Sequence, residues 1–182
     1  MEGITKIKTG KLLTLSVQQL IDCVKGSSCD GGYIEDAFSY IIKSGGITSA
    51  SNYHYKAANG NCSKYRSYQH AAKIRGYVNL PQNNEAALLK AVAKQPDSVS
   101  IDASSKEFQL YSSGVFTGKC DTSLDHGVTV VGYGVAHGVK YWLVKNSWGT
   151  GWGENGYIRI QRNPGFAQGR CGIAMESSYP TA

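Results

Sequence analysis

The chain has 182 residues, of which 41% are hydrophobic, and it carries 19 Lys and Arg against 13 Asp and Glu. This apolar fraction suffices for a packed core and excludes wholesale disorder, and no apolar run approaches the roughly 20 residues of a membrane span. The net charge of +6 comes from basic residues that form no block and accompany no recognition motif, so we expect a solvated basic surface rather than nucleic-acid binding.

Helical patterns dominate the first part of the chain. Ser16 and Gln19 form a capping-box pattern, and the spacing of Val17, Leu20, Ile21 and Val24 predicts a helix with an apolar stripe over residues 16–25. A second helix is expected over 33–43, and Gly45 and Gly46 after it are expected to end it. A third is expected over 84–95, before Pro96. Residues 48–70 are polar and irregular.

Strand patterns dominate the second part. Residues 157–161 alternate with period two, as a half-buried strand does. Further strands are expected at 98–103, 128–133 and 141–145, with a short helical turn near 105–111 and a turn through His137 and Gly138. Helices followed by strands favour an α+β protein with two lobes, whose boundary we place near residue 78.

The chain has an odd number of cysteines: Cys23, Cys29, Cys62, Cys120 and Cys171. Their wide spacing, without a CxxC pair, argues against a zinc ribbon and favours disulfides in an oxidising compartment. The odd cysteine is then a free thiol, part of an intermolecular bond, or one whose partner is missing. No apolar segment follows Met1, so we expect no signal peptide and a mature or truncated chain.

One histidine differs from the other three. His54, His70 and His137 lie in polar, loop-like surroundings, whereas His126 precedes a strongly apolar run. Taken alone, His126 fits a core or edge histidine. The segment Lys145-Asn146-Ser147-Trp148 favours a second interpretation, in which Asn146 orients the His126 ring. An asparagine carbonyl can accept an imidazole proton, and an indole can shield that hydrogen bond from water. The alternative for this segment is a glycine-rich hairpin with structural tryptophans.

Both segments resemble the histidine and asparagine regions of papain-family cysteine proteases, especially those of plants. The resemblance extends over the whole chain, through residues 16–23, 29–33, 95–96, 108–111 and 171–180. It implies a papain-like α+β fold with a truncated helical lobe in residues 1–78 and an antiparallel, barrel-like β lobe in 79–182. It also implies peptide hydrolysis through a thioester, with His126 as general base and acid, Asn146 as its orienting partner and Trp148 as the shield.

The nucleophile of that family has no counterpart in the sequence. In papain-like proteases the histidine follows the catalytic cysteine by about 130–150 residues, and the cysteine lies in a Cys-Gly-Ser/Ala-Cys-Trp/Tyr motif. Such a distance from His126 reaches a point before Met1, and the motif is absent. Residues 1–10 resemble the end of the helix that carries this cysteine. We therefore expect an N-terminally truncated chain that is inactive alone, and neither Cys23 nor Cys29 has the surroundings to replace the nucleophile.

The resemblance has further implications. It implies disulfides Cys23–Cys62 and Cys120–Cys171, with Cys29 unpaired. The residues implied in substrate binding are Gly31 and Gly32, through their backbone, and Tyr33, Ile34, Ser100, Leu124, Gly127 and Glu176, around the second substrate residue upstream of the cut. It implies no metal and no cofactor. The implied partners are peptide or protein substrates and cystatin-like inhibitors, without nucleic acid or membrane, for a monomer of the secretory pathway, in a vacuole, a lysosome or the extracellular space.

Two other functions remain open at this point. The chain could be a non-catalytic peptide-binding module with the papain fold, or a gene-model fragment without a function of its own. One departure from the family bears on packing, because Asp97 stands where relatives usually have Val at the start of a buried strand, and an unpaired buried carboxylate is costly. Asn61-Cys62-Ser63 is a glycosylation sequon beside an implied disulfide.

Overall fold

The computed structural model describes all 182 residues and divides them into two compact units. Unit 1 comprises Met1–Val78 together with Pro180–Ala182, and unit 2 comprises Asn79–Tyr179. The sequence prediction placed Pro180–Ala182 with the β lobe, but these residues belong with unit 1, where the Arg75 amide donates to the Thr181 carbonyl at 2.8 Å. None of the helices has the length and apolar character that crossing a membrane requires.

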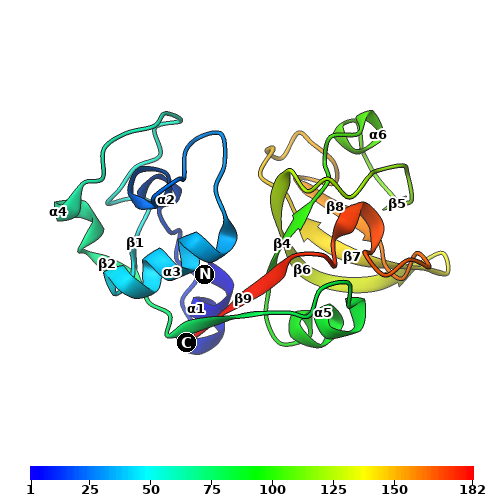
Figure 1. Cartoon of the computed structure of the whole chain (residues 1–182), viewed down its shortest axis with the longest axis horizontal. Helices are drawn as coiled ribbons and strands as arrows, with labels where there is room; N and C mark the ends of the chain where they lie inside the picture. The colour runs from blue at the N-terminus through cyan, green and yellow to red at the C-terminus, as the bar shows by residue number, and fades with distance from the viewer. The chain divides into compact units, whose positions relative to one another are not determined.

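Unit 1 contains the first helices of the chain and a small antiparallel sheet (Figure 1). The helices are α1 (Glu2–Thr9), α2 (Val17–Cys23), α3 (Ile34–Ser44) and α4 (Lys64–Ser67), and the paired strands are β1 (Ile47–Thr48) and β2 (His70–Ala72). The buried core of the unit consists of Ile4, Leu15, Phe38, Ile41, Ile47, Ala72 and Ile74. The segment 48–70 is therefore not wholly irregular, since it includes α4.

Helix α2 confirms one prediction and corrects another. Ser16 caps it, because the Ser16 hydroxyl accepts from the Gln19 amide at 3.0 Å. The predicted apolar stripe is wrong at Val17, which is 57% exposed, whereas Gln18 and Gln19 are fully buried. Each amide side chain finds distant backbone partners: the Gln18 oxygen accepts from the Lys56 amide and the Gln19 oxygen from the Thr48 amide, both at 2.8 Å. Hydrogen bonds thus stabilise buried amides that periodicity assigns to solvent.

Helix α3 follows its prediction closely. Its buried residues are Phe38 and Ile41. The helix ends at Gly45, which has a φ of 81° and donates its amide to the Ile42 carbonyl. This left-handed conformation suits glycine and satisfies a carbonyl that the helix end leaves open.

Unit 2 is built on a mostly antiparallel sheet. Its elements are α5 (Glu85–Val92), β4 (Asp97–Ile101), α6 (Lys106–Gln109), β5 (Val115–Phe116), β6 (His126–Ala136), β7 (Val139–Lys145), β8 (Tyr157–Gln161), a 3-10 turn (Arg170–Gly172) and most of β9 (Ser177–Thr181), whose last two residues belong to unit 1. With β3 (Gly76–Asn79), the strand order is β3-β9-β4-β6-β7-β8-β5. Strands β4, β6, β7 and β8 pair antiparallel, and β5 pairs with β8 in parallel.

The boundaries in unit 2 differ from prediction mainly at the ends of elements. Strand β8 spans the predicted residues, whereas β6 is longer at both ends than the predicted 128–133. Helix α5 ends at Val92, before the predicted end at 95. Seven side chains of the sheet are fully buried in its core: Val99, Ile101, Val130, Trp142, Val144, Ile158 and Ile160. Farther along β6, Tyr133 and Val135 are 45% and 62% exposed.

Strand β4 begins with a carboxylate in this core. Asp97 is fully buried and pairs in register with Val130 of β6. Neither oxygen of its carboxylate has a hydrogen-bond partner. Burial raises the pKa of Asp97 to about 7, against a smaller opposing effect of the Ser98 amide. The free-energy cost of an unpaired buried carboxylate, which the sequence predicts, is therefore present in the fold.

Candidate functional site

Two neighbouring strands bring His126 and Asn146 together. His126 is the first residue of β6, and Asn146 directly follows the last residue of β7. The strands are antiparallel with Thr129 opposite Lys145, so the beginning of β6 lies beside the end of β7. Residues 20 positions apart in sequence thereby become neighbours, as the resemblance implies.

The contact between these side chains defines the tautomer of the neutral imidazole. His126 Nε2 lies 2.7 Å from Asn146 Oδ1. The Ser147 amide donates to the same Oδ1 at 2.7 Å, so this atom is the carbonyl oxygen, which can only accept. Nε2 must therefore carry the proton when the ring is neutral, and the lone pair is left on Nδ1.

Trp148 covers this pair. The ring centroids of His126 and Trp148 are 5.1 Å apart, and Asn146 is buried although Trp148 is 40% exposed. Trp148 rests in turn on Trp152 and Phe108, at centroid distances of 5.0 Å and 5.7 Å. An apolar cover of this kind lowers the local dielectric and strengthens the hydrogen bond beneath it.

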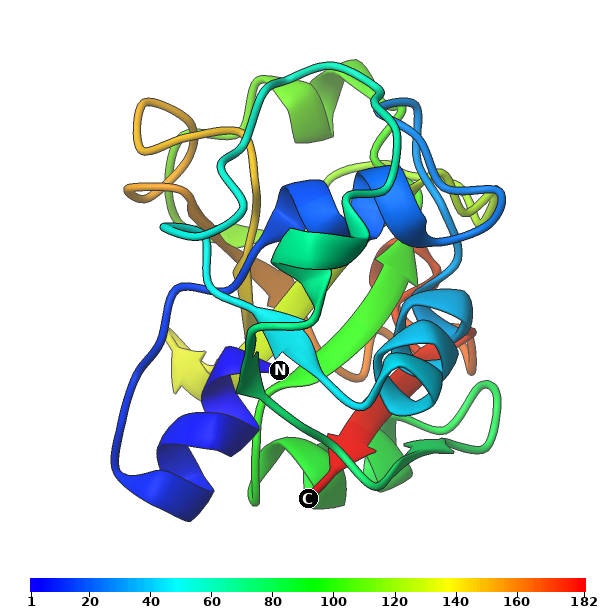
Figure 2. The same ribbon diagram turned by 90° about the vertical axis from the view of Figure 1, so that its left-hand side faces the viewer.

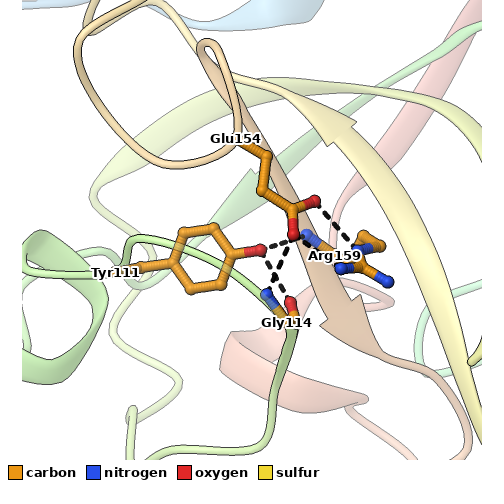
Figure 3. A network of polar contacts seen from close by, with 4 residues as sticks. All are labelled: Tyr111, Gly114, Glu154 and Arg159. Carbon is orange, nitrogen blue, oxygen red and sulfur yellow. Dashed lines mark hydrogen bonds and ion pairs between the residues drawn. The ribbon is translucent and has the colours of Figure 1, made fainter. Parts of the chain in front are cut away.

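A carboxylate network holds the loop that carries Trp148 (Figure 3). Arg159 on β8 donates to Glu154 from Nε at 2.9 Å and from Nη2 at 2.6 Å. The Gly114 amide donates to the same carboxylate at 2.9 Å, and the Tyr111 hydroxyl donates to the Gly114 carbonyl at 2.7 Å. Hydrogen bonds from Arg159 hold the pKa of Glu154 below its usual range. Three segments of unit 2 are thereby joined at one ion pair.

The same loop is held by aromatic contacts. The Tyr111 and Trp152 rings lie 5.7 Å apart, and Trp152 Nε1 donates to the Gln109 carbonyl at 2.9 Å. Gly153, which directly follows Trp152, has a φ of 55°, and a Cβ at this position would lie 2.5 Å from the Tyr157 carbonyl. Only glycine fits this turn, which places Trp152 beneath Trp148.

Asp125 is a site residue that the sequence analysis missed. Its backbone amide donates to the Ile101 carbonyl at 3.0 Å, and its side chain accepts from the Ala103 amide at 2.8 Å. These bonds fasten the residue before His126 to β4 and the segment after it. The sequence signal that could have identified Asp125 is its position directly before His126.

Comparison with known proteins agrees with this geometry. A family profile described as "Papain family cysteine protease" matches residues 1–181. The chain belongs to the papain family of cysteine proteases. It is 55% identical to Cysteine endopeptidase RepA of Oryza sativa subsp. japonica, over 99% of this chain and 49% of that protein. It is also 55% identical to Vignain of Phaseolus vulgaris, over 99% of this chain and 51% of that protein.

Solved structures of papain-family proteins show the same fold. Bromelain from Ananas comosus, solved in complex with the E64 inhibitor, superposes with a TM-score of 0.95 and 51% identity, over 99% of this chain and 83% of the bromelain chain. The proform of the ragweed pollen allergen Amb a 11 gives the same TM-score with 48% identity, over 99% of this chain and 50% of that chain. The predicted papain-like α+β fold is confirmed, and the chain spans about half the length of the curated relatives it matches.

The cysteines of this papain-family chain form the pairs that the resemblance implies. Cys23 is bonded to Cys62 in unit 1, and Cys120 to Cys171 in unit 2. Cys29 is an exposed free thiol, and its backbone amide donates to the Asn59 side chain at 2.7 Å. It lies in unit 1, in a loop rather than at the start of a helix.

The implied substrate residues of unit 1 lie in the loop before α3. The Gly31 amide and carbonyl both bond to Ser28, at 3.2 Å and 2.8 Å, so this backbone is engaged within its own loop. Gly32 packs closely on Ser27, where a Cβ would meet the hydroxyl at 2.3 Å. Tyr33 is 77% exposed at the N-cap of α3, and Ile34 begins that helix.

The implied substrate residues of unit 2 lie around the pairing of β4 with β6. Ser100 and Gly127 are partners in register, and the Ser100 amide donates to the Glu176 carbonyl at 3.0 Å. Leu124 packs against Gly172, where an added Cβ would lie 2.7 Å from the leucine side chain. Ser100, Gly127 and Glu176 are thus adjacent at one end of β4, next to His126.

Proposed function

We propose that these 182 residues supply the imidazole and amide half of the active site of a cysteine endopeptidase. The observation that carries the proposal is the 2.7 Å contact between His126 Nε2 and Asn146 Oδ1. A carbonyl oxygen at this position keeps the proton on Nε2 and leaves Nδ1 free to accept the proton of a thiol. Membership in the papain family supports a thiol as the nucleophile.

In the proposed mechanism, Nδ1 of His126 removes the thiol proton and the thiolate attacks the carbonyl carbon of the substrate. The imidazolium gives this proton to the amide nitrogen as the carbon–nitrogen bond breaks, which leaves a thioester. Nδ1 then deprotonates a water molecule and the hydroxide attacks the thioester. The carbon–sulfur bond breaks to release the acid, and the imidazolium returns its proton to the departing thiolate. Asn146 holds the plane of the His126 ring through both steps, and Trp148 excludes water from the hydrogen bond between His126 and Asn146.

The thiol in this proposal comes from outside the 182 residues. Four of the five cysteines are in disulfides, and Cys29 lacks the sequence motif of the family nucleophile. We propose that the 182 residues alone do not hydrolyse peptides, because removing one member of such a catalytic unit lowers the rate by about three to six orders of magnitude.

For the remaining properties we propose what the family resemblance implies. Residues 1–78, joined by 180–182, act as the helical lobe and 79–179 as the β lobe. The substrate residues described above favour a hydrophobic side chain at the second position upstream of the cut. Two disulfides support an oxidising compartment of the secretory pathway, such as a vacuole or the extracellular space. Protein substrates and cystatin-like inhibitors are the proposed partners of a monomer.

Two experiments test the proposed function. The first sequences the transcript upstream of Met1, where an in-frame Cys-Gly-Ser-Cys-Trp-like segment is expected. The second joins the 182 residues to the N-terminal part of bromelain that this chain does not match and measures labelling by E64 and hydrolysis of a peptide. We expect the joined protein to be labelled and active, its His126→Ala variant to be inactive, and the 182 residues alone to be unlabelled.

The outcomes separate the three functions. If the joined protein folds by circular dichroism but stays inactive while bromelain is active under the same conditions, the endopeptidase proposal is wrong. Peptide binding by that inactive protein would then favour the peptide-binding module. A stop codon directly upstream of Met1, with no protein detectable in the tissue, would favour a gene-model fragment.

A further inference from the structure

The charge of the chain is segregated along the sequence. Between Asp36 and Glu85 there is no Asp or Glu, but there are six basic residues: Lys43, Lys56, Lys64, Arg66, Lys73 and Arg75. The other Lys and Arg equal the 13 Asp and Glu in number, so this stretch accounts for the entire net charge of +6. All six side chains are exposed and none is in an ion pair, since the ion pair of the chain joins Arg159 to Glu154.

Large exposed aromatic rings lie in the same stretch. Tyr55, Tyr65 and Tyr68 are 63%, 79% and 71% exposed, although tyrosine is usually intermediate in burial. Tyr65 and Tyr68 are three residues apart in α4 and at its C-cap, so they occupy neighbouring positions on the helix surface. We call Tyr55, Lys56, Lys64, Tyr65, Arg66 and Tyr68 the basic tyrosine face.

The basic tyrosine face is carried by a fixed backbone. Figure 2 shows α4 and the long loop before it on the side of unit 1 that faces the viewer. Lys56 Nζ and Arg66 Cζ each lie 6.0 Å from the centre of the buried Tyr53 ring, so one ring gathers two cations. The Tyr53 hydroxyl donates to Asp22 at 2.7 Å, and the Asn52 amide group donates to the Arg66 carbonyl at 2.9 Å.

A disulfide and short-range bonds complete this support. Cys62, two residues before α4, is bonded to Cys23 at the end of α2. The Ser67 hydroxyl donates to the Lys64 carbonyl at 2.9 Å, which reinforces the single turn of α4. Little conformational freedom of the backbone is left to lose when a ligand binds this face, and such preorganisation favours affinity.

We propose that the basic tyrosine face binds an acidic polysaccharide, a polymer of sugars that carry carboxylates. Cations without carboxylate partners attract a polyanion and release its counterions on binding. Exposed tyrosines add flat apolar rings for the C–H faces of the sugars and hydroxyl groups for their polar edges. A small anion would use the cations alone and a neutral polysaccharide the rings alone, whereas an acidic polysaccharide uses both.

A nucleic acid is the competing class of ligand, because it also combines charge with stacking surfaces. The chain lacks a nucleic-acid recognition motif, and its two disulfides indicate an oxidising compartment outside the cytosol and nucleus. These observations favour the polysaccharide. The proposal concerns unit 1 alone and does not depend on the proposed peptidase activity.

The test measures the binding of polygalacturonate to the 182-residue chain by calorimetry, with dextran as the uncharged polymer. We expect binding to polygalacturonate and none to dextran. Because several cations act together, the affinity is expected to fall by at least about tenfold between about 50 and 200 mM salt. Single-stranded DNA of the same charge is measured in parallel and is expected to bind more weakly.

Matched variants locate the binding surface. The double variant Lys64→Gln/Arg66→Gln is expected to bind at least about tenfold more weakly and with a shallower salt dependence. Its control, Lys90→Gln/Lys94→Gln, makes the same change of charge at two exposed positions in and just after α5 of unit 2 and is expected to bind as the parent chain does. The variant Tyr65→Ala/Tyr68→Ala is expected to bind more weakly with an unchanged salt dependence.

Three results would overturn the proposal. The first is an absence of polygalacturonate binding by the parent chain, whose folding circular dichroism verifies. The second is an equal loss of affinity in Lys64→Gln/Arg66→Gln and in its control Lys90→Gln/Lys94→Gln, which would indicate that net charge, and not this surface, determines the binding. The third is tighter binding of the DNA, which would assign the basic tyrosine face to nucleic acid.

Discussion

Arg159 donates two hydrogen bonds to the carboxylate of Glu154, and this pair joins strand β8 to the loop that carries Trp148. Both side chains are about one quarter exposed, and the Gly114 amide adds a third bond to the same carboxylate. Bidentate geometry and partial burial distinguish this ion pair from a surface ion pair of little consequence. The stability of unit 2 therefore depends on it.

Replacing Glu154 by Gln removes the charge and is expected to lower the free energy of unfolding by about 1.5–3 kcal/mol at pH 7, the range for hydrogen bonds to charged groups. Because Arg159 lowers the pKa of Glu154, the contribution is present above the ordinary pKa of glutamate and is lost as the pH falls through the lowered value. Urea unfolding of both proteins at several pH values measures this. Glu176→Gln, at an exposed position, is the control, and an equal effect of both changes would contradict the prediction.

Asp97 is expected to make the protein less stable as the pH rises. The folded chain keeps a proton on this carboxylate up to about pH 7, whereas the unfolded chain loses it near 3.8, so stability falls between these values. The full difference corresponds to roughly 4 kcal/mol. Asp97→Val and Asp97→Asn should flatten this pH dependence, and the part of their gain over the parent that comes from ionisation should be large at pH 8 and absent below about pH 4.

Chemical unfolding between pH 3 and pH 8 tests the Asp97 prediction. Asp30→Asn, at an exposed position in unit 1, serves as the control and should leave the pH dependence unchanged. A parent chain with equal stability at pH 4 and pH 7 would show that Asp97 is solvated or paired in solution.

The cover that Trp148 provides is testable without peptidase activity. In Trp148→Ala the proton on His126 Nε2 should exchange with water about tenfold faster or more, as expected if the indole contributes about 1.4 kcal/mol to protecting the bond. Nitrogen-resolved NMR of the imidazole measures this exchange. Trp148→Phe should restore part of the protection, and a proton that exchanges equally fast in all three proteins would contradict the shielding role.

The disulfide between Cys23 and Cys62 should contribute about 2–4 kcal/mol to stability, because it closes a long loop of the unfolded chain. The variant Cys23→Ser/Cys62→Ser should unfold at a lower urea concentration, with faster amide exchange in residues 53–68. Cys29→Ser changes an exposed free thiol and should match the parent. If Cys29→Ser destabilises the chain as much as the double variant, Cys29 has a partner in solution.

Sequence patterns predicted elements whose stability is local. Strand β8 follows its period-two alternation, and the cap at Ser16 follows from residues three positions apart. Gln18 and Gln19 could not be predicted as buried, because their partners Lys56 and Thr48 lie far away in the sequence. Helix α4 was missed since a single turn has no periodicity to detect.

The candidate site was predictable from the resemblance rather than from periodicity. Taken alone, His126 fitted a core histidine. Only the segment around Asn146 and Trp148 indicated that His126 pairs with Asn146. Asp125 escaped because its role is to accept from the distant Ala103 amide. The charge segregation between Asp36 and Glu85 escaped because a search for consecutive basic residues does not detect a long stretch without acidic ones.

All three indoles of the chain, those of Trp142, Trp148 and Trp152, belong to unit 2, whereas unit 1 contains no tryptophan. Fluorescence excited in tryptophan alone will therefore report the unfolding of unit 2 and not that of unit 1. Comparing such an emission curve with far-ultraviolet ellipticity offers a label-free way to learn whether the halves lose their structure in a single step.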